Sequence, residues 1–190
     1  MTSFINDIEK CIEVLKNGGL ILHPTDTIWG IGCDATNEDG VAKVYALKKR
    51  PDEKSLIVLL ADEKDILKYV AQPDLSVFDY LHTVTKPTTV IYDGPIGFAD
   101  NLIADDNTIA IRITTDAFCK HLIKYFRKPI VSTSANVSGY ASPLVFNDIS
   151  ETIKNGVDYI VQHRQNDLTP ATASSIIKWN ANGTPAIIRP

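Results

Sequence analysis

With 190 residues, 44% of them hydrophobic, the chain can bury one hydrophobic core and is short for two, so we predict a single domain over residues 1–190. Its formal net charge of −4 disfavours the class of proteins that bind nucleic acid through a broad basic face. The N-terminus lacks the basic and apolar regions of a signal peptide, and no later segment has the length of a transmembrane helix. The sequence therefore predicts a soluble, cytoplasmic protein that does not bind membranes.

The cysteines and histidines are scattered along the chain. Cys11, Cys33 and Cys119 are odd in number and far apart, which disfavours a disulfide framework and a structural zinc site. The four histidines are equally dispersed, so no metal site built by the protein is indicated. We expect any metal to arrive with a phosphate-bearing substrate.

The first regular elements that the sequence predicts are a helix and a short strand. Residues 5–15 carry apolar side chains at helical spacing, and Asn17-Gly18-Gly19 supplies residues that commonly end a helix. Residues 20–22 then form an apolar strand. The strand runs into the polar stretch 23–27, where we expect ligand contacts, because strand ends in α/β sheets usually carry them.

A second helix is predicted from the N-cap candidates at residues 34–37 to Pro51, which cannot continue a helix. It places Lys48 and Arg50 in its last turn. Apolar runs and helical periodicity predict the remaining elements: strands at 55–60, 88–92, 109–113, 129–131, 159–162, 174–179 and 186–189, and helices near 63–70, 74–82, 116–126 and 148–155. Because helices and strands are mixed throughout, this order predicts an α/β fold with an open, twisted, mixed sheet and flanking helices.

Hydroxyl, amide and cationic side chains gather at the predicted strand ends, a composition that suits an anion. The donors and acceptors are Thr25, Asp26, Thr27, Ser132, Thr133, Ser134, Asn136, Ser138, Thr172, Ser174 and Ser175, and the cations are Lys48, Arg50, Lys54, Arg112 and Arg189. Arg112 is the most informative, because a charge inside the apolar run 109–113 is costly to bury unless it is paired or faces a site. The Gly-x-Ser-x-Gly pattern of a serine nucleophile is absent. The Walker A and dinucleotide glycine patterns are absent too, so ATP would have to bind through a different set of phosphate contacts.

Each of these clusters also has a purely structural explanation. The run Ser132-Thr133-Ser134-Ala135-Asn136 could be a capped turn, since small polar residues favour caps and turns. Lys48-Lys49-Arg50-Pro51 could reflect only the preference for cations at a helix C-terminus. The basic stretch 120–128 is interpreted as a solvated helix face.

Taken in order, the motifs resemble one known family. They are the segment from Gly18 to Ala35 around His23-Pro24-Thr25-Asp26-Thr27, then Leu47-Lys48-Lys49-Arg50-Pro51, then Ile109-Ala110-Ile111-Arg112, then the segment from Pro129 to Gly139, and the terminal Ile187-Ile188-Arg189-Pro190. Over nearly the whole chain this order resembles the YrdC-like threonylcarbamoyl-AMP synthase family, in its short, bacterial-type form. The resemblance implies an open, twisted α/β sheet with a large, concave, positively charged cavity.

The resemblance also implies an activity. Threonine and bicarbonate would form a carbamate, which would take AMP from ATP with release of pyrophosphate, and Mg²⁺ would accompany the ATP. A partner transferase complex would then move the threonylcarbamoyl group onto an adenosine of tRNA, and weak direct binding of tRNA is compatible with this role. Positioning and phosphate neutralisation would supply much of the catalysis, so no catalytic residue is assigned.

Site residues follow from the resemblance position by position. The nucleotide contacts that it implies are Lys48, Arg50, Lys54, Thr108, Ser134, Asn136, Ser142 and Arg189. The threonine contacts that it implies are Thr27, Arg112, Ser132 and Ser175, with Arg112 pairing the threonine carboxylate.

Two other functions on the same fold are alternatives. One is an RNA-binding or ribosome-associated module, against which the net negative charge and the lack of an aromatic stacking platform count. The other is a YciO-like paralogue with altered chemistry. The joint presence of Lys48, Arg50, Ser134 and Asn136 favours the synthase, whereas Leu59 stands where some relatives carry a histidine near the threonine. Trp29 likewise replaces the more usual tyrosine or phenylalanine.

Overall fold

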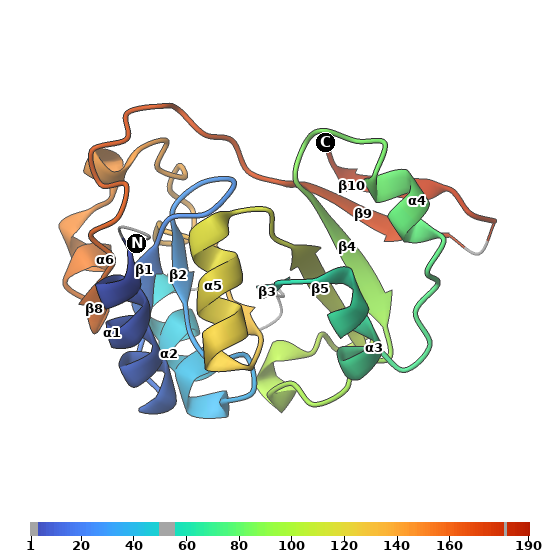
Figure 1. Ribbon diagram of the computed structural model, residues 1–190, viewed down its shortest axis with the longest axis horizontal. Helices are drawn as coiled ribbons and strands as arrows, with labels where there is room; N and C mark the ends of the chain where they lie inside the picture. The colour runs from blue at the N-terminus through green and yellow to red at the C-terminus, as the bar shows by residue number, and fades with distance from the viewer. Residues whose placement is uncertain (1–3, 50–55, 181) are drawn as a thin grey trace.

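The computed structural model describes residues 4–49, 56–180 and 182–190, and the strands in these ranges form two sheets (Figure 1). The four-stranded sheet has the order β7 (Thr133–Ser134), β2 (Gly30–Gly32), β1 (Ile21–His23), β8 (Tyr159–Ile160). The six-stranded sheet has the order β10 (Pro185–Arg189), β9 (Ser175–Trp179), β4 (Thr88–Asp93), β5 (Thr108–Ile113), β3 (Ile57–Leu60), β6 (Ile130–Val131). Both sheets contain parallel and antiparallel pairs, so the predicted mixed α/β fold is confirmed, although the strands divide between two sheets.

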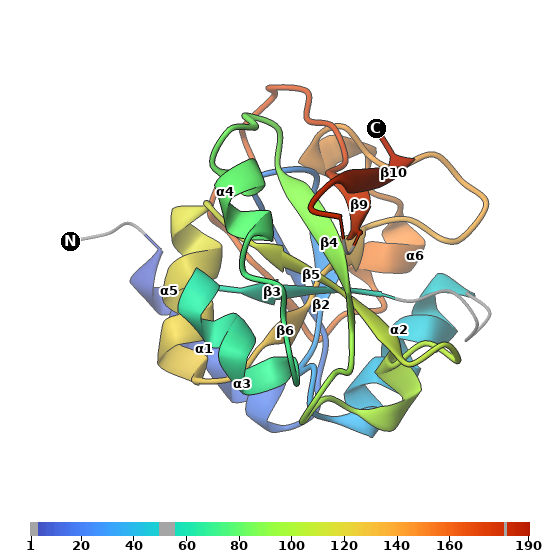
Figure 2. The ribbon, with the colours of Figure 1, turned by 90° about the vertical axis from the view of Figure 1, so that its right-hand side faces the viewer.

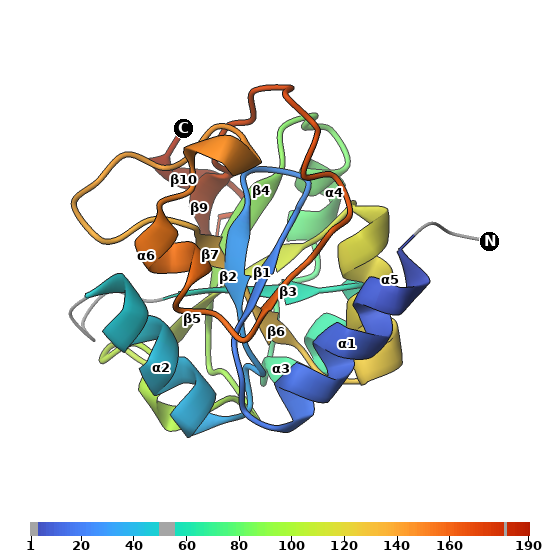
Figure 3. The ribbon, with the colours of Figure 1, turned by 90° about the vertical axis from the view of Figure 1, so that its left-hand side faces the viewer.

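Helices flank both sheets. They are α1 (Ile5–Lys16), α2 (Glu38–Lys48), α3 (Ile66–Tyr69), α4 (Val77–Leu81), α5 (Ala117–Phe126) and α6 (Glu151–Lys154), with 3-10 turns η1 (Glu63–Asp65), η2 (Asp100–Leu102) and η3 (Phe146–Asp148). Figure 3 shows α1 beside α5, and the Phe4 and Phe118 rings meet edge to face there, with centroids 5.6 Å apart. None of the helices in the described part of the chain is both long enough and apolar enough to cross a bilayer.

The two sheets are joined within five residues. β6 pairs with β3 in the six-stranded sheet, and β7 pairs with β2 in the four-stranded sheet. Ser132 lies between them, and its backbone N–H donates to Ile57 O at 2.8 Å. The polar run that the sequence analysis placed after a strand is therefore the joint between the sheets, and its side chains lie where the sheets meet.

The helix α2 begins and ends close to its predicted bounds. The Asn37 side chain accepts a hydrogen bond from the Gly40 N–H at 2.8 Å, which caps the first turn. Lys48 is in the last turn, as predicted, and Lys49 takes the left-handed conformation (φ 49°) that commonly ends helices. Arg50 and Lys54, both predicted nucleotide contacts, lie outside the described residues.

The helix predicted near residues 63–70 is confirmed over residues 63–69, with its first turn in the 3-10 form. It consists of η1 followed by the single turn of α3. The chain leaves the helix because it pairs with the segment after β4: Ala71 N donates to Gly94 O, and Ile96 N donates to Tyr69 O, each at 2.9 Å. Backbone pairing with this segment begins where the helix ends, at Tyr69.

Candidate active site

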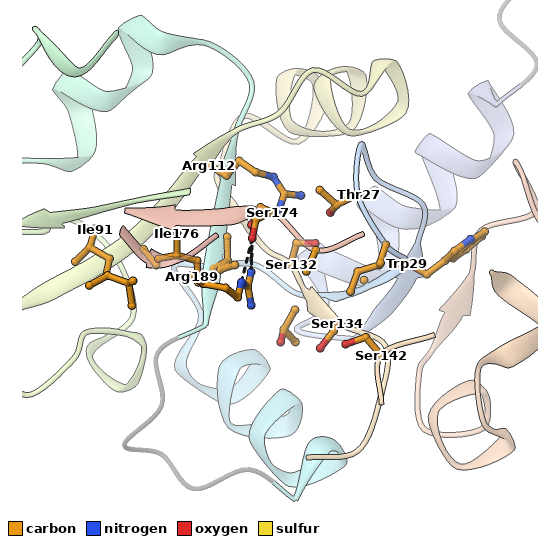
Figure 4. Close-up of a pocket in the computed structure, with 17 residues that line it drawn as sticks. Thr27, Trp29, Ile91, Arg112, Ser132, Ser134, Ser142, Ser174, Ile176 and Arg189 are labelled. Atoms are coloured by element: carbon orange, nitrogen blue, oxygen red, sulfur yellow. Dashed lines mark hydrogen bonds between the residues drawn. The ribbon is translucent and has the colours of Figure 1, made fainter. Parts of the chain in front are cut away.

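A cavity of about 230 Å³ receives side chains from both sheets (Figure 4). One part of its wall is apolar and comes from the six-stranded sheet: Ile57, Ile91, Ala110, Ile176 and Ile188. The hydroxyl side chains of the wall are Thr27, Ser132, Thr133, Ser134, Ser142 and Ser174. Arg112 and Arg189 also line the cavity, and no Asp or Glu is among the described residues of its wall. The cavity is therefore electropositive and carries many neutral donors.

Arg112, on β5, is buried (4% exposed) and is held by Asp26, a residue that does not line the cavity. Its Nη2 donates to Asp26 Oδ1 at 3.0 Å. The other Asp26 oxygen accepts from the Thr115 N–H at 2.9 Å and from the Thr114 and Thr115 hydroxyls at 3.3 and 3.2 Å. Arg112 Nε has no hydrogen-bond partner among the described residues. Asp26 thus compensates the buried positive charge of Arg112 and orients its guanidinium. The remaining N–H groups of the guanidinium can still donate hydrogen bonds to an anionic ligand.

Arg189, near the end of β10, is docked against Ser174. Its Nε and Nη2 donate to Ser174 O at 3.0 and 2.8 Å, and Nη2 lies 3.3 Å from Ser174 Oγ (Figure 4). Ser174 Oγ in turn lies 2.9 Å from Thr89 Oγ1 on β4, and both of these hydroxyl residues are buried. Partial burial, and then the positive charge of Arg112, lower the pKa of Arg189 below its ordinary value. The guanidinium groups of Arg112 and Arg189 therefore both line the cavity and give it positive charge.

Lys48 lies beneath the joint rather than in the cavity wall. Its side chain is buried (1% exposed), and Nζ donates to Ser134 O and, at 2.7 Å, to Asn136 O. Ser134 Oγ and Asn136 Oδ1 are each 3.5 Å from Nζ. A buried ammonium that donates to backbone carbonyls of residues 134–136 fixes the course of that segment.

The loop between β1 and β2 is held by its own hydroxyls. Thr25 Oγ1 donates to Ile28 O at 2.8 Å and accepts from the Thr27 N–H at 2.9 Å. Thr27 Oγ1 lies 2.9 Å from Thr25 Oγ1, and Thr27 faces the cavity (Figure 4). The Trp29 ring points away from the other labelled side chains and packs on Phe146, with centroids 4.8 Å apart. Only part of the loop is therefore available to a ligand.

A family model for Sua5/YciO/YrdC proteins, described as "Telomere recombination", matches residues 13–190. The chain belongs to the Sua5/YciO/YrdC family. A relative from Hahella chejuensis (strain KCTC 2396), named threonylcarbamoyl-AMP synthase, is 32% identical over 163 residues, which cover 85% of this chain and 89% of the relative. A relative of the same name from Pseudoalteromonas translucida (strain TAC 125) is 32% identical over 179 residues, or 93% of this chain and 94% of the relative.

Solved structures of the family have the same fold. P. abyssi Sua5 complexed with L-threonine has a TM-score of 0.83 and 22% identity, and the match covers 96% of this chain and 53% of the Sua5 chain. The chain thus spans about half the length of Sua5. E. coli YciO has a TM-score of 0.82 and 19% identity, with 97% of this chain and 88% of YciO covered. At these identities the likeness shows the fold.

The structure brings most of the site residues predicted from the Sua5/YciO/YrdC resemblance together. Six of them line the cavity: Thr27, Arg112, Ser132, Ser134, Ser142 and Arg189. Lys48 contacts the Ser134 backbone, and Asn136 lines an adjoining cavity of about 510 Å³. Thr108 is buried at the start of β5, where its hydroxyl donates to Asp106 Oδ1 at 2.6 Å, and it is not part of the cavity wall. Ser175 is not part of the wall either, whereas its neighbour Ser174 is.

Three residues hold the site through contacts that sequence reasoning did not identify: Asp26 and Ser174 were counted only as polar residues at strand ends, and Thr89 was not singled out. Asp26 stood in the polar run after the first strand, but nothing in the run identifies its partner Arg112, 86 residues away. Ser174 and Thr89 are 85 residues apart and meet only across the β4–β9 pairing. A buried threonine in a strand resembles an ordinary β-branched core residue, so the sequence carries no signal for Thr89.

The glycine at position 30 keeps room for the Ser132 hydroxyl. A Cβ at Gly30 would lie 2.5 Å from Ser132 Oγ and 3.4 Å from His23 Nε2. Because Oγ can rotate away, we expect Gly30→Ala to fold and to raise the KM for the ligand of this cavity about fivefold, the loss of one neutral hydrogen bond. Gly40→Ala, in α2, is the control, since its Cβ would meet Cys33 Cβ at 3.4 Å. Equal KM values for the two variants would contradict this account of Ser132.

His23, buried behind the cavity, makes stability depend on pH. Burial lowers its pKa from 6.5 to about 4, and Nδ1 lies 3.1 Å from Pro24 O. Above about pH 6.5 the imidazole is neutral in the folded and the unfolded chain. As the pH falls to 4 only the unfolded chain takes up the proton, so we expect the free energy of unfolding to fall by about 3 kcal/mol from this residue. Urea unfolding of the wild type and His23→Asn at pH 7 and pH 4 measures this difference, and an identical loss in both proteins would refute it.

Proposed function

We propose that this protein is a threonylcarbamoyl-AMP synthase. The observation that carries the proposal is the electropositive cavity, in which Arg112 and Arg189 face a set of hydroxyls without an acidic residue in the described wall. A substrate that brings both a carboxylate and phosphates fits this composition. The two curated relatives that share this chain's length carry the same name.

The reaction needs no nucleophile from the protein. The amine of threonine adds to bicarbonate and loses water, which gives a carbamate. A carbamate oxygen then attacks the α-phosphorus of ATP, the bond to the β-phosphate oxygen breaks, and pyrophosphate leaves. The work left to the protein is to hold the two substrates in line and to neutralise the charge that develops on the phosphates.

The two substrates would occupy different parts of the site, which would extend beyond the cavity wall to Ser175 and Thr108. We assign the threonine to Thr27, Arg112, Ser132 and Ser175, with the carboxylate on the side of Arg112 that Asp26 does not occupy. We assign ATP to Lys48, Arg50, Lys54, Thr108, Ser134, Asn136, Ser142 and Arg189. Lys48 would act through the 134–136 segment that it holds. Mg²⁺ would enter with the ATP, and its oxygen ligands would come from the phosphates and from serine hydroxyls such as Ser134 and Ser142.

The product would serve a partner that modifies tRNA. A mixed anhydride of a carbamate and AMP hydrolyses readily, so its threonylcarbamoyl group has to pass to a transferase complex, which would attach it to an adenosine of tRNA. Direct binding of tRNA by this chain would be weak. The cytoplasm is the compartment where these partners and substrates meet.

The test is pyrophosphate release by the purified protein with ATP, Mg²⁺ and bicarbonate, comparing threonine with serine and with no amino acid. We expect release that depends strictly on threonine and bicarbonate. The adenylated product should be identified by mass spectrometry. If the folded protein releases no pyrophosphate under these conditions, the result would contradict the synthase proposal and favour a YciO-like role with altered chemistry.

A further inference from the structure

A second concave surface lies at the other ends of the strands that build the cavity. β3 contributes Ile57 to the cavity and Leu60 to this surface, and the chain around β6 contributes Ser132 to the cavity and Pro129 to this surface. Since a strand rises about 3.3 Å per residue, the two places are about 10 Å apart along these strands. The surface encloses about 380 Å³, within the range of small-molecule sites, and shares no lining residue with the cavity.

We call this surface the basic cleft; it is formed by residues 60–62, 64–65, 68–69, 123–124 and 127–129. Figure 2 shows α3 and α5, which carry parts of it, on the same side of the molecule. Five cations line it, Lys64, Lys68, Lys124, Arg127 and Lys128, against the two carboxylates Asp62 and Asp65. This surplus of positive charge is local, because the whole chain has a net charge of −4.

Only some of these cations are neutralised. Lys64 pairs with Asp62 at 3.8 Å, Lys68 pairs with Asp65 at 2.8 Å, and Lys128 pairs with the buried Asp34 at 2.7 Å. Lys124 and Arg127 form no ion pair within the described ranges of the chain, and both are exposed. Their charge is therefore available to a ligand that enters the cleft.

The backbone at Arg127 gives an independent reason to assign a role to its side chain. Arg127 is the C-cap of α5 and has a φ of 63°, the left-handed region that glycine usually occupies at this position. A side chain there carries a conformational cost that glycine avoids. The helix dipole favours cations at this end of α5, but it does not explain Lys64 and Lys68, which face α5 from another segment.

We propose that the basic cleft is a second anion site, separate from the candidate active site, which binds a run of two or more adjacent phosphate groups. Each phosphate group brings between one and two negative charges at neutral pH, so two adjacent groups match the surplus charge of the cleft. Lysines on two sides supply point charges, and Arg127 supplies a fork that can hold phosphate oxygens bidentately. Tyr69 adds a hydroxyl to the wall.

An NMR titration of the ¹⁵N-labelled protein with inorganic tripolyphosphate tests the proposal. The amides of residues 60–64 and 124–128 report the basic cleft, and those of residues 132–134 report the candidate active site, so binding at the two places is measured separately. We expect saturable shifts in the first set. Arg127→Gly should weaken binding there about tenfold, the loss of one charge-assisted contact. The same variant should unfold at an equal or higher temperature, because glycine relieves the left-handed backbone.

Two further variants separate a built site from diffuse attraction. Lys124→Gln should also weaken binding about tenfold, whereas Lys120→Gln, on the same helix and outside the cleft lining, should not. Equal losses in these two variants would overturn the proposal, as would the absence of shifts at the cleft amides or equal binding of citrate. A parallel titration with a single-stranded oligonucleotide distinguishes the source: tighter binding than tripolyphosphate identifies nucleic-acid phosphates, and weaker binding identifies a free polyphosphate.

Discussion

Replacing Arg112 with alanine is expected to lower kcat/KM for threonine at least about 100-fold, with a smaller change in the KM for ATP. The side chain is buried, is oriented by Asp26 at 3.0 Å, and retains a buried Nε without a partner among the described residues. Removing one member of a buried, hydrogen-bonded charge pair commonly costs 2–5 kcal/mol, and the middle of this range, about 3 kcal/mol, corresponds to more than 100-fold in rate. Steady-state pyrophosphate release with threonine as the varied substrate measures the effect.

Asp26 provides the internal check on this prediction. If Asp26 acts by orienting Arg112, Asp26→Asn should lower kcat/KM for threonine less than Arg112→Ala does, and the double variant should be hardly worse than Arg112→Ala alone. Arg112→Lys should not restore activity, since a point charge cannot replace the fork that reaches Asp26 and a ligand together. Circular dichroism and a urea titration establish that each variant folds. A folded Arg112→Ala protein with unchanged threonine kinetics would refute the assignment.

Replacing Lys48 with methionine is expected to impair both ATP use and stability. Methionine keeps most of the buried stem but removes the donor from Ser134 O and Asn136 O. Ser134 O keeps the Asn136 N–H as a donor at 2.9 Å, whereas Asn136 O loses the Lys48 donor. Loss of a hydrogen bond to a charged group costs about 1.5–3 kcal/mol, so the free energy of unfolding should fall by roughly that amount. Because the 134–136 segment loses its anchor, we expect kcat/KM for ATP to fall by about 100-fold.

Lys43→Met is the matched control for Lys48→Met. Lys43 is also on α2, and its Nζ also donates to a backbone carbonyl, Gly18 O, at 2.8 Å, but it is exposed and lies outside the cavity wall. We expect ATP kinetics like those of the wild type and a smaller loss of stability. If Lys43→Met impaired ATP use as much as Lys48→Met, the effect would come from α2 as a whole and not from the joint between the sheets.

The basic cleft and the candidate active site share strands, which gives the proposed second site a physical connection to the first. β3 reaches the cavity at Ile57 and the cleft at Leu60. A ligand that fixes the side chains of the basic cleft would contact one end of β3 and of the chain around β6. The other end of these packed strands positions Ser132, whose N–H donates to Ile57 O. The Arg127→Gly variant, which removes the cleft ligand without touching the cavity, is therefore also the protein in which any effect of polyphosphate on pyrophosphate release should disappear.

Local patterns along the chain are enough to predict the class of fold and most of the elements. Helical spacing identified α1, and the N-cap candidates at residues 34–37 together with Pro51 delimited α2, because the forces that set such elements act between residues close in sequence. The sequence also indicated a buried charge with a role at Arg112, since a cation inside an apolar strand needs a partner wherever the strand packs.

The assembly of the site depends on contacts between segments that are far apart in the sequence. Asp26 meets Arg112 and Lys48 meets Ser134 across 86 residues, and Ser174 rather than Ser175 faces the cavity. Periodicity gives the spacing of side chains along one element but not which elements become neighbours, and adjacent strand residues point to opposite faces, so an error of one position reverses a prediction.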